Sequence, residues 1–380
     1  MEAITNKNSN KSRILRLIKA LGEISRADLA KQSALTRPTV SSIVSELEGE
    51  NLIVETGKGK SSGGKRPIML TLKNDAVFAL GIDVADEYFL RGVLCDFSGS
   101  RVEGAEVPYE NSFDSILESL KLLIAKLLKG REMKVIKGIG MAVSGVVDHN
   151  ANEVIHSSNF DIANRGLAEL ISRHTGLPVY MEKRPNTAAF AEKTMGSGKE
   201  FSDFIYLTTG RGVGAGIIYR GQIFRGSFGG AGEIGKSILF SREDFLNNSG
   251  EAMLEHRMRE TYLASRVEKA KGRAIKFPDI LELYQSGDRD VEDIINENAE
   301  LLAAAASVMC NFFNPEALIL GGRKKELGEK YRSYFEEVFN THHANPYTGK
   351  TKIVLSHFGR DGVSIGGAAM ILDKTINLDL

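Results

Sequence analysis

A glycine-rich stretch near the middle of the chain has the spacing of a loop that can hold a phosphate. Gly210, Gly212, Gly214 and Gly216 occupy every second position directly after Thr209. Because glycine lacks a Cβ, successive backbone N–H groups in such a loop can approach an anion closely. The same spacing also suits a tight β-turn that binds no ligand. The stretch therefore indicates either a phosphate cradle or a plain turn.

A second stretch, within the first fifty residues, has the residue types that contact DNA. Val40, Ile43, Val44 and Leu47 recur at helical spacing and predict a helix with one apolar stripe, which Thr36 is expected to cap. The residues expected to face DNA lie at the helix start and outside the stripe: Arg37, Pro38, Thr39, Ser41, Ser42 and Ser45. Hydroxyls contact bases or phosphates, and arginine can bind guanine with two hydrogen bonds. The alternative is a plain three-helix bundle with a serine-rich surface.

The elements around this helix are those of a winged helix. Apolar residues over 14–21 predict a first helix, and Ser25 with Asp28 has the pattern of a capping box at the start of a second. Residues 52–55 and 68–72 have the pattern of two strands joined by a glycine-rich basic loop. The loop residues expected to contact DNA are Lys58, Lys60, Lys65 and Arg66. Such a wing can lie along or inside a minor groove, and the alternative is a flexible linker.

The charge of the chain is unevenly distributed. Residues 1–72 contain twelve Lys and Arg and seven Asp and Glu, a net charge of +5, whereas the whole chain has a net charge of zero. A basic N-terminal segment favours a polyanionic partner, and with the winged-helix pattern it predicts double-stranded DNA. The sequence contains neither a signal-peptide pattern nor an apolar run long enough to span a membrane. We therefore expect a cytoplasmic protein with no membrane partner.

From residue 77 onward, strands and helices alternate. Residues 78–84 and 89–95 have the pattern of paired strands, 116–128 of an amphipathic helix and 135–143 of a buried strand, and a second set of strands begins at 204–207. Two α/β units of this kind predict two lobes with a ligand cleft between them.

Four motifs in these lobes resemble those of the ROK family, named for repressors, open reading frames and kinases. Gly138–Asp148 is similar to the family's GIGIPGPVD segment, and Thr208–Ile218 to its phosphate loop. Gly221–Gly235 is similar to its sugar-side signature, and Asn314–Gly322 to its adenosine-side strand and turn. The resemblance covers nearly all of residues 75–380 and implies an α/β, two-lobed, actin-like ATPase (ribonuclease H-like) fold. The winged helix with its GGKRP wing resembles the front end of the family's repressor branch.

The resemblance also suggests domain boundaries and phosphate-loop residues. We expect a winged-helix domain over 1–72, a first lobe over 73–192 that the C-terminal helix of about 361–380 joins, and a second lobe over 193–360. The residues that match the nucleotide-phosphate loops, in degenerate form, are Asp83, Thr209, Gly210, Gly212, Gly214, Gly321 and Gly322. Because the glycines that normally follow Asp83 are missing, the resemblance leaves residual ATP and Mg²⁺ binding open.

The family's catalytic motif is altered in this chain. Where its kinases carry a sugar-binding Asn and a catalytic Asp, the sequence has Lys183 and Arg184. A guanidinium group stays protonated near neutral pH and cannot act as the general base that sugar phosphorylation needs. We therefore expect no catalytic residue and no kinase activity. The alternative is an ATP-dependent sugar kinase, of the glucose or N-acetylglucosamine class, with an appended DNA-binding domain.

The family's zinc motif is altered as well. Its histidine is replaced by Lys236, and no cysteine remains in the segment that follows. We therefore expect no structural zinc and no cofactor. Glu233 and Glu255 match the family's sugar-contacting glutamates, whereas Asn159 and Asp161 match further sugar contacts only loosely.

The expected effector site thus combines carboxylates with added cations. Lys183, Arg184 and Lys236 could hold a phosphorylated or acidic sugar near the start of a helix. Alternatively, Arg184 and Lys236 could pair with Glu233 in an internal ion-pair network. The resulting hypothesis is a DNA-binding repressor of sugar-metabolism genes, a homodimer or homotetramer, that a sugar or sugar phosphate controls from between the lobes.

Overall fold

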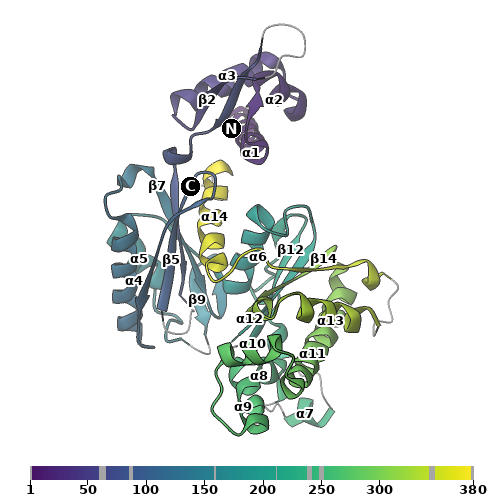
Figure 1. Cartoon of the computed structure of the whole chain (residues 1–380). Coiled ribbons are helices and arrows are strands. Elements are labelled where there is room, and N and C mark those ends of the chain that lie inside the picture. Colours follow the sequence, from purple (N-terminus) through teal and green to yellow (C-terminus); the bar gives the residue numbers. More distant parts are fainter. Residues whose placement is uncertain are drawn as a thin grey trace. The chain divides into compact units, whose positions relative to one another are not determined.

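The computed structural model describes residues 2–59, 66–84, 89–157, 160–210, 212–237, 242–247, 252–341 and 347–377. The chain forms two compact units. The first contains residues 1–145, 150–182 and 364–380, and the second contains residues 146–149 and 183–363. Figure 1 labels the helices and strands along the chain. None of the helices in the described part of the chain is long and apolar enough to cross a membrane.

The N-terminal part of the first unit is a winged helix. Its elements are α1 (Glu2–Leu21), β1 (Ile24–Ser25), α2 (Arg26–Ser33), α3 (Arg37–Gly49), β2 (Ile53–Lys58) and β3 (Ile68–Leu72). The strands form a sheet in the order β1-β3-β2. Ile14, Ile18, Val44 and Leu47 are fully buried because their spacing places them on the inner side of each helix. The predicted order of helices and strands is confirmed, with the short β1 added.

Side-chain caps set where α2 and α3 begin. The Ser25 hydroxyl accepts a hydrogen bond from the backbone N–H of Asp28 at 3.1 Å, and the Thr36 hydroxyl accepts one from Thr39 at 3.4 Å. These bonds satisfy N–H groups that the first turn of a helix leaves without partners. Both predicted caps are therefore confirmed.

The rest of the first unit is a sheet between helices. Its elements are β4 (Phe78–Asp83), β5 (Phe89–Asp96), β6 (Arg101–Pro108), α4 (Phe113–Leu128), β7 (Ile136–Val143), β9 (Glu153–His156), α5 (Leu167–Thr175), β10 (Val179–Lys183) and α14 (Gly362–Asn377). The five-stranded sheet has the order β10-β7-β4-β5-β6. Within this unit, α4 and α5 lie on one side of the sheet and α14 on the other (Figure 1).

Glycines allow α14 to lie directly against the sheet. A Cβ on Gly81 would come within 1.7 Å of the Ser364 carbonyl oxygen, and one on Gly140 within 2.1 Å of the Gly367 oxygen. The backbone of α14 therefore packs directly on the backbone of β4 and β7, and no side chain lies between them that could move aside. Any larger residue at these glycines would displace the helix.

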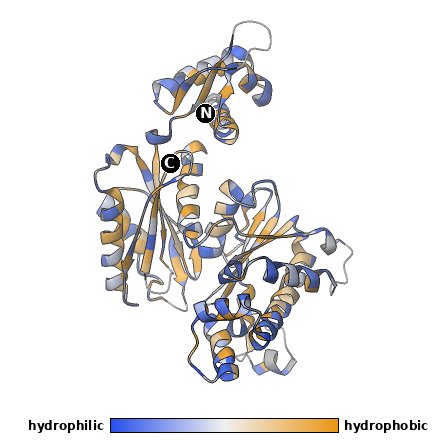
Figure 2. Ribbon diagram, in the orientation of Figure 1, coloured by the Kyte–Doolittle hydropathy of each residue, from blue (hydrophilic) through white to orange (hydrophobic). Residues whose placement is uncertain are grey.

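The second unit is a five-stranded sheet with helices on both faces. Its elements are β8 (Val146–Asp148), α6 (Arg184–Met195), β11 (Phe204–Thr209), β12 (Val213–Tyr219), β13 (Gln222–Ile223), α7 (Arg242–Asn247), α8 (Leu254–Met258), α9 (Glu260–Lys271), α10 (Phe277–Gln285), α11 (Arg289–Phe313), β14 (Ala317–Gly322), α12 (Arg323–Glu326), α13 (Gly328–Thr341) and β15 (Lys352–Leu355). The sheet order is β13-β12-β11-β14-β15. Figure 2 shows hydrophobic residues concentrated on the strands.

Alternation along β11 divides the core of this unit in two. Phe204 and Tyr206 pack with α6, whereas Ile205 and Leu207 belong to the cluster that α11 and α13 complete. Side chains of a strand alternate between its two faces, so each apolar residue meets one helical layer. Because α6 packs on β11 and β12, residues 183–192 fall within the second unit and not within the first lobe, where sequence predicts them.

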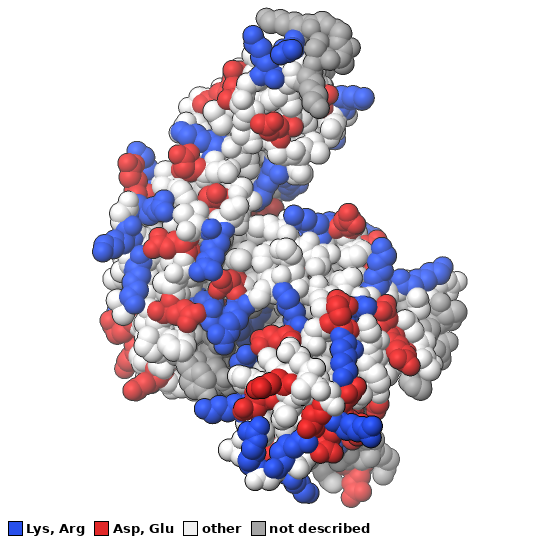
Figure 3. Space-filling model, in the orientation of Figure 1, with Lys and Arg blue, Asp and Glu red and all other residues white. Residues whose placement is uncertain are grey.

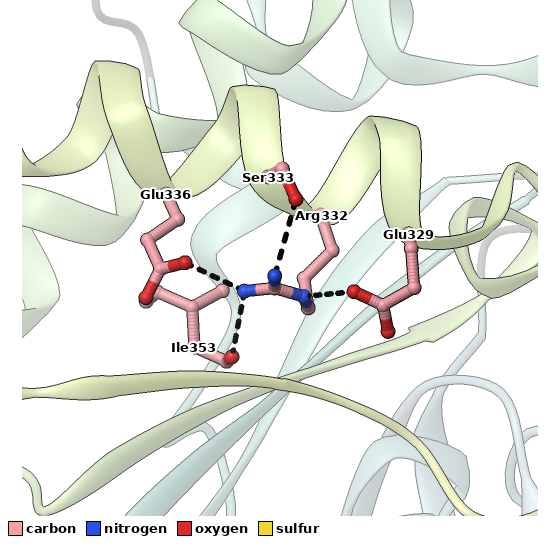
Figure 4. Close-up of polar contacts among 5 residues, drawn as sticks. All are labelled: Glu329, Arg332, Ser333, Glu336 and Ile353. Carbon is pink, nitrogen blue, oxygen red and sulfur yellow. Dashed lines mark hydrogen bonds and ion pairs between the residues drawn. The ribbon is translucent and has the colours of Figure 1, made fainter.

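Polar contacts also attach a helix to this sheet. Arg332 of α13 donates to Glu336 at 2.6 Å, to the Ser333 hydroxyl at 3.1 Å and to the Ile353 carbonyl of β15 at 3.4 Å, and it also pairs with Glu329 (Figure 4). Hydrogen bonds and the two flanking carboxylates raise the pKa of this guanidinium. The fork geometry of arginine lets one side chain bind α13 and β15 together.

Candidate functional site

The polar residues of α3 form one exposed surface. Arg37, Pro38, Ser41, Ser42 and Ser45 are exposed, and Thr39 is half-buried beside the Thr36 hydroxyl at 2.8 Å. Arg37, Ser41 and Ser45 are four residues apart and share one side of the helix. The structure thus brings together the residues that sequence predicted to face DNA on this helix.

The wing contributes cations next to this helix. Lys58 ends β2 and Arg66 precedes β3, and both are exposed. Lys60 and Lys65 lie outside the described residues. Figure 3 shows Lys and Arg side chains interspersed with Asp and Glu on the visible surface of the winged helix. Exposed cations such as Lys58 and Arg66 suit the phosphates of a nucleic acid.

A buried ion pair lies at the start of the second unit. The Nζ of Lys183 donates to Oε1 of Glu233 at 2.8 Å and to the Ala231 carbonyl at 2.7 Å. The Lys183 side chain is 1% exposed and that of Glu233 is 38% exposed. Glu233 is therefore held by a buried cation while part of its carboxylate stays accessible to a ligand.

A second carboxylate is paired beside the first. Glu255 accepts from the Nζ of Lys236 at 2.8 Å and from Arg259 at 3.3 Å. The short helical turn Ile234–Lys236 joins the two pairs, and a Cβ on Gly235 would lie 3.1 Å from the Glu255 Cβ. The turn therefore places Glu233 and Glu255 in one region of the second unit.

The ion pairs differ from those that sequence reasoning offered as an internal network. That network paired Lys236 with Glu233, whereas Lys236 binds Glu255 and Lys183 binds Glu233. Arg184 begins α6 and is half-buried. Burial raises the pKa of the Tyr206 phenol to about 12, although the charge of Arg184 acts to lower it.

The glycine loop joins β11 and β12 as a tight hairpin. Thr209 ends β11, the Gly210 N–H donates to the Gly212 carbonyl at 3.0 Å, and a Cβ on Gly214 would lie 2.9 Å from the Pro185 side chain. A Cβ on Gly321 would come within 2.0 Å of the Tyr206 hydroxyl. Gly214 and Gly321 thus have a role in close packing, independent of any phosphate.

Glutamates also lie against this loop. The Glu260 N–H donates to the Gly210 carbonyl at 2.9 Å, and its carboxylate accepts from Arg323 at 3.1 Å. Oε2 of Glu255 lies 3.5 Å from the point where a Cβ on Gly212 would be. Both carboxylates are paired with cations, Glu260 with Arg323 and Glu255 with Lys236 and Arg259, so the negative charge beside the loop is balanced. The sequence did not predict Arg259, Glu260 or Arg323 as site residues. Arg323 alone could have been identified, because it directly follows Gly322.

The remaining predicted residues are less closely grouped. Asp83 is buried at the end of β4, and Asp161 is exposed and pairs with Arg165 at 2.7 Å, both within the first unit. Gly322 ends β14 with a φ of 63°, which favours glycine. Asn159 lies outside the described residues. Among the residues that the structure describes, no group of His, Cys, Asp and Glu is arranged to hold a metal ion.

Comparison with known proteins agrees with both parts of the chain. The model of the ROK family matches residues 79–374, and that of the MarR family matches residues 7–56. The xylose repressor of Caldicellulosiruptor bescii is 31% identical, over 98% of this chain and 97% of its own. The same fold is found in the crystal structure of a ROK-family transcriptional regulator that is a homologue of the Escherichia coli MLC protein. It superposes with a TM-score of 0.84 and 24% identity, over 99% of this chain and 98% of the regulator.

The body alone matches a sugar kinase. A ROK-family glucokinase from Streptomyces griseus, solved with glucose and a nucleotide analogue, superposes with a TM-score of 0.67 and 22% identity. The match covers 77% of this chain and 98% of the kinase, which shows a shared fold for the body. The chain therefore belongs to the ROK family, in its branch of transcriptional repressors of sugar-utilisation genes that carry an N-terminal winged helix-turn-helix.

Proposed function

We propose that this repressor binds operator DNA through α3 and its wing, and that a neutral sugar bound at Glu233 and Glu255 releases it. The observation that carries the proposal is that both glutamates are already paired with cations. Carboxylates accept hydrogen bonds from sugar hydroxyls, and the xylose repressor named above supports an aldopentose as the first ligand to test.

The ion pairs favour a neutral ligand over an anionic one. Lys183 and Lys236 each bind a glutamate at 2.8 Å, so their charges are already balanced inside the site. A sugar phosphate would have to compete with these carboxylates for the same N–H groups. A neutral sugar needs only oxygen acceptors for its hydroxyl groups. The Glu233 side chain, 38% exposed, is more accessible than that of Glu255, which is 19% exposed.

We also propose that the body is not a kinase. Arg184 occupies the position of the family's catalytic Asp, and a guanidinium group cannot accept the hydroxyl proton.

A footprint of the purified protein on DNA upstream of its own gene tests the proposal. A homodimer is expected to protect two half-sites about 34 Å apart, one helical turn of DNA. Xylose is expected to abolish protection in a panel of neutral sugars, and the matching sugar phosphates to leave it intact. Release of the operator by a sugar phosphate alone would contradict the proposal of a neutral ligand. A DNA that stays unprotected at low salt would contradict DNA binding itself.

Arg37→Ala is expected to weaken operator binding by about ten- to a hundredfold, because one bidentate base contact contributes about 1–3 kcal/mol. Arg37 is exposed at the first position of α3. Affinity for unrelated DNA should fall much less, and fluorescence anisotropy with both duplexes measures the difference. Lys31→Ala removes one exposed cation from α2 and serves as the control. Equal losses on both duplexes would assign Arg37 to phosphate contact instead.

A further inference from the structure

The last helix of the chain joins the two units. Residues 362 and 363 of α14 belong to the second unit, and the helix continues from residue 364 within the first. Its close backbone contacts at Gly81 and Gly140 hold it firmly on its own sheet. A rigid element of this kind can carry a displacement from one end to the other.

The segment before α14 is attached to the helix that follows the effector site. Glu192 of α6 is 1% exposed and accepts from the Ser356 hydroxyl at 2.5 Å, the His357 N–H at 3.2 Å and the Phe358 N–H at 3.3 Å. The first residue of α6, Arg184, directly follows Lys183, which holds Glu233. A shift of this ion pair would therefore move α6 together with the segment that leads into α14.

The far end of α14 contacts the DNA-binding domain. Arg16 of α1 donates through Nε to Oδ1 of Asn377 at 3.0 Å, and Asn377 donates to Asp373 at 3.0 Å. Burial lowers the pKa of Lys19 on α1, while the charges of Asp373 and Asp96 act to raise it. The contact is thus a hydrogen-bonded chain from Arg16 to Asp373, and the charge of Asp373 also acts favourably on Lys19.

Within the winged helix, α1 is tied to the recognition helix. The Nζ of Lys11 in α1 donates to both carboxylate oxygens of Glu50 at 2.5 and 2.6 Å, and to Glu46 at 3.3 Å. The lysine is buried, with 6% of its surface exposed, whereas the Glu50 side chain is 43% exposed. Any movement of α1 is therefore passed to the C-terminal end of α3.

We infer that α14 transmits sugar binding to α3, through the hydrogen bond between Arg16 of α1 and Asn377, which Asp373 orients. The inference rests on the proposed function, because it requires that a sugar controls operator binding. Each step from Glu233 to α3 is a hydrogen bond or ion pair within one unit, or a covalent continuation of the chain. Asn377, Asp373 and Lys19 are positioning residues in this path and contact neither ligand.

The combined variant Lys19→Met/Asn377→Ala tests the inference. The wild-type protein is expected to lose operator affinity by about 5–150-fold when saturated with sugar, the usual range of coupling between sites. In the variant, the ratio of operator affinity without sugar to operator affinity with sugar should fall below about threefold. Its affinity for sugar, measured by calorimetry, and its affinity for operator without sugar should stay within about threefold of wild type. Asn377→Ala alone, which removes only terminal hydrogen bonds, should lower the ratio partially and guards against misfolding of the combined variant.

Lys374→Met is the matched control, because Lys374 lies on α14 and its Nζ packs 4.4 Å from the Tyr180 ring centre. It should respond to sugar like wild type. Full release of operator by sugar in both the combined and the single variant would overturn the inference and leave the proposed function intact. A wild-type protein that no sugar releases would overturn both.

Discussion

Lys324→Met is expected to stabilise the protein by about 4 kcal/mol at pH 7. Lys324 follows the glycine turn at the end of β14, is 2% exposed, and its Nζ has no hydrogen-bond partner among the described residues. Burial lowers the pKa of this ammonium from 10.5 to about 7, although Glu260 acts to raise it. Methionine has a similar length and no charge to desolvate.

The gain should depend on pH in a defined direction. Between pH 7 and 10.5 the unfolded chain keeps a proton on Lys324 that the folded chain has lost, so wild-type stability rises with pH over this window. The advantage of Lys324→Met is therefore fully present below pH 7, falls to roughly 2 kcal/mol at pH 9, and disappears above pH 10.5.

Thermal unfolding from pH 6 to 10 measures this effect. At pH 7 the melting temperature of the variant should rise by about 10 °C, given about 2–4 °C per kcal/mol for a unit of this size. Lys269→Met, at an exposed position of α9, is the control and should change little. A pH-independent gain would mean that packing, and not the buried charge, limits stability at this position.

Glu233→Ala is expected to destabilise the protein by about 3 kcal/mol, and Lys183→Met by only about 1 kcal/mol. The pair is asymmetric, because Lys183 is 1% exposed and Glu233 is 38% exposed. Removing the glutamate leaves a buried ammonium that keeps the Ala231 carbonyl but loses this carboxylate. Removing the lysine leaves a carboxylate that water can reach, so its desolvation cost is small.

A double-mutant cycle separates this asymmetry from general damage. The variant Lys183→Met/Glu233→Ala should be more stable than Glu233→Ala alone, because it no longer buries an ammonium that has lost the Glu233 carboxylate. Urea unfolding of the four proteins gives the coupling free energy. Equal losses in the two single variants, with no recovery in the double, would show that Lys183 is solvated more than its exposure indicates. Both single variants should also lose release by sugar.

The DNA-binding end of the protein could be predicted from sequence because its signals are local. The Ser25 and Thr36 caps act over three residues, and the apolar stripe of α3 repeats every three or four. Local hydrogen bonds and helical periodicity determine such elements wherever they occur. The exposed face from Arg37 to Ser45 follows from the same period.

The motifs of the body predicted the family and the α/β fold, and they identified Glu233 and Glu255 as candidates. They did not determine which cation each glutamate binds. Lys183 and Glu233 are fifty positions apart and meet only because α6 and the segment that contains Glu233 pack together. Such pairing depends on packing directions that no local pattern encodes.

Lys324 shows the same limit most clearly. Between Arg323 and Lys325 it reads as one of three surface cations, yet it is buried while both neighbours contact acceptors nearer the surface. Sequence by itself therefore determined the main elements, the exposed polar face of α3 and the family. Only the tertiary structure decided which charges are buried, paired and shared between helices, because the free energy of a charge depends on the atoms that replace water around it.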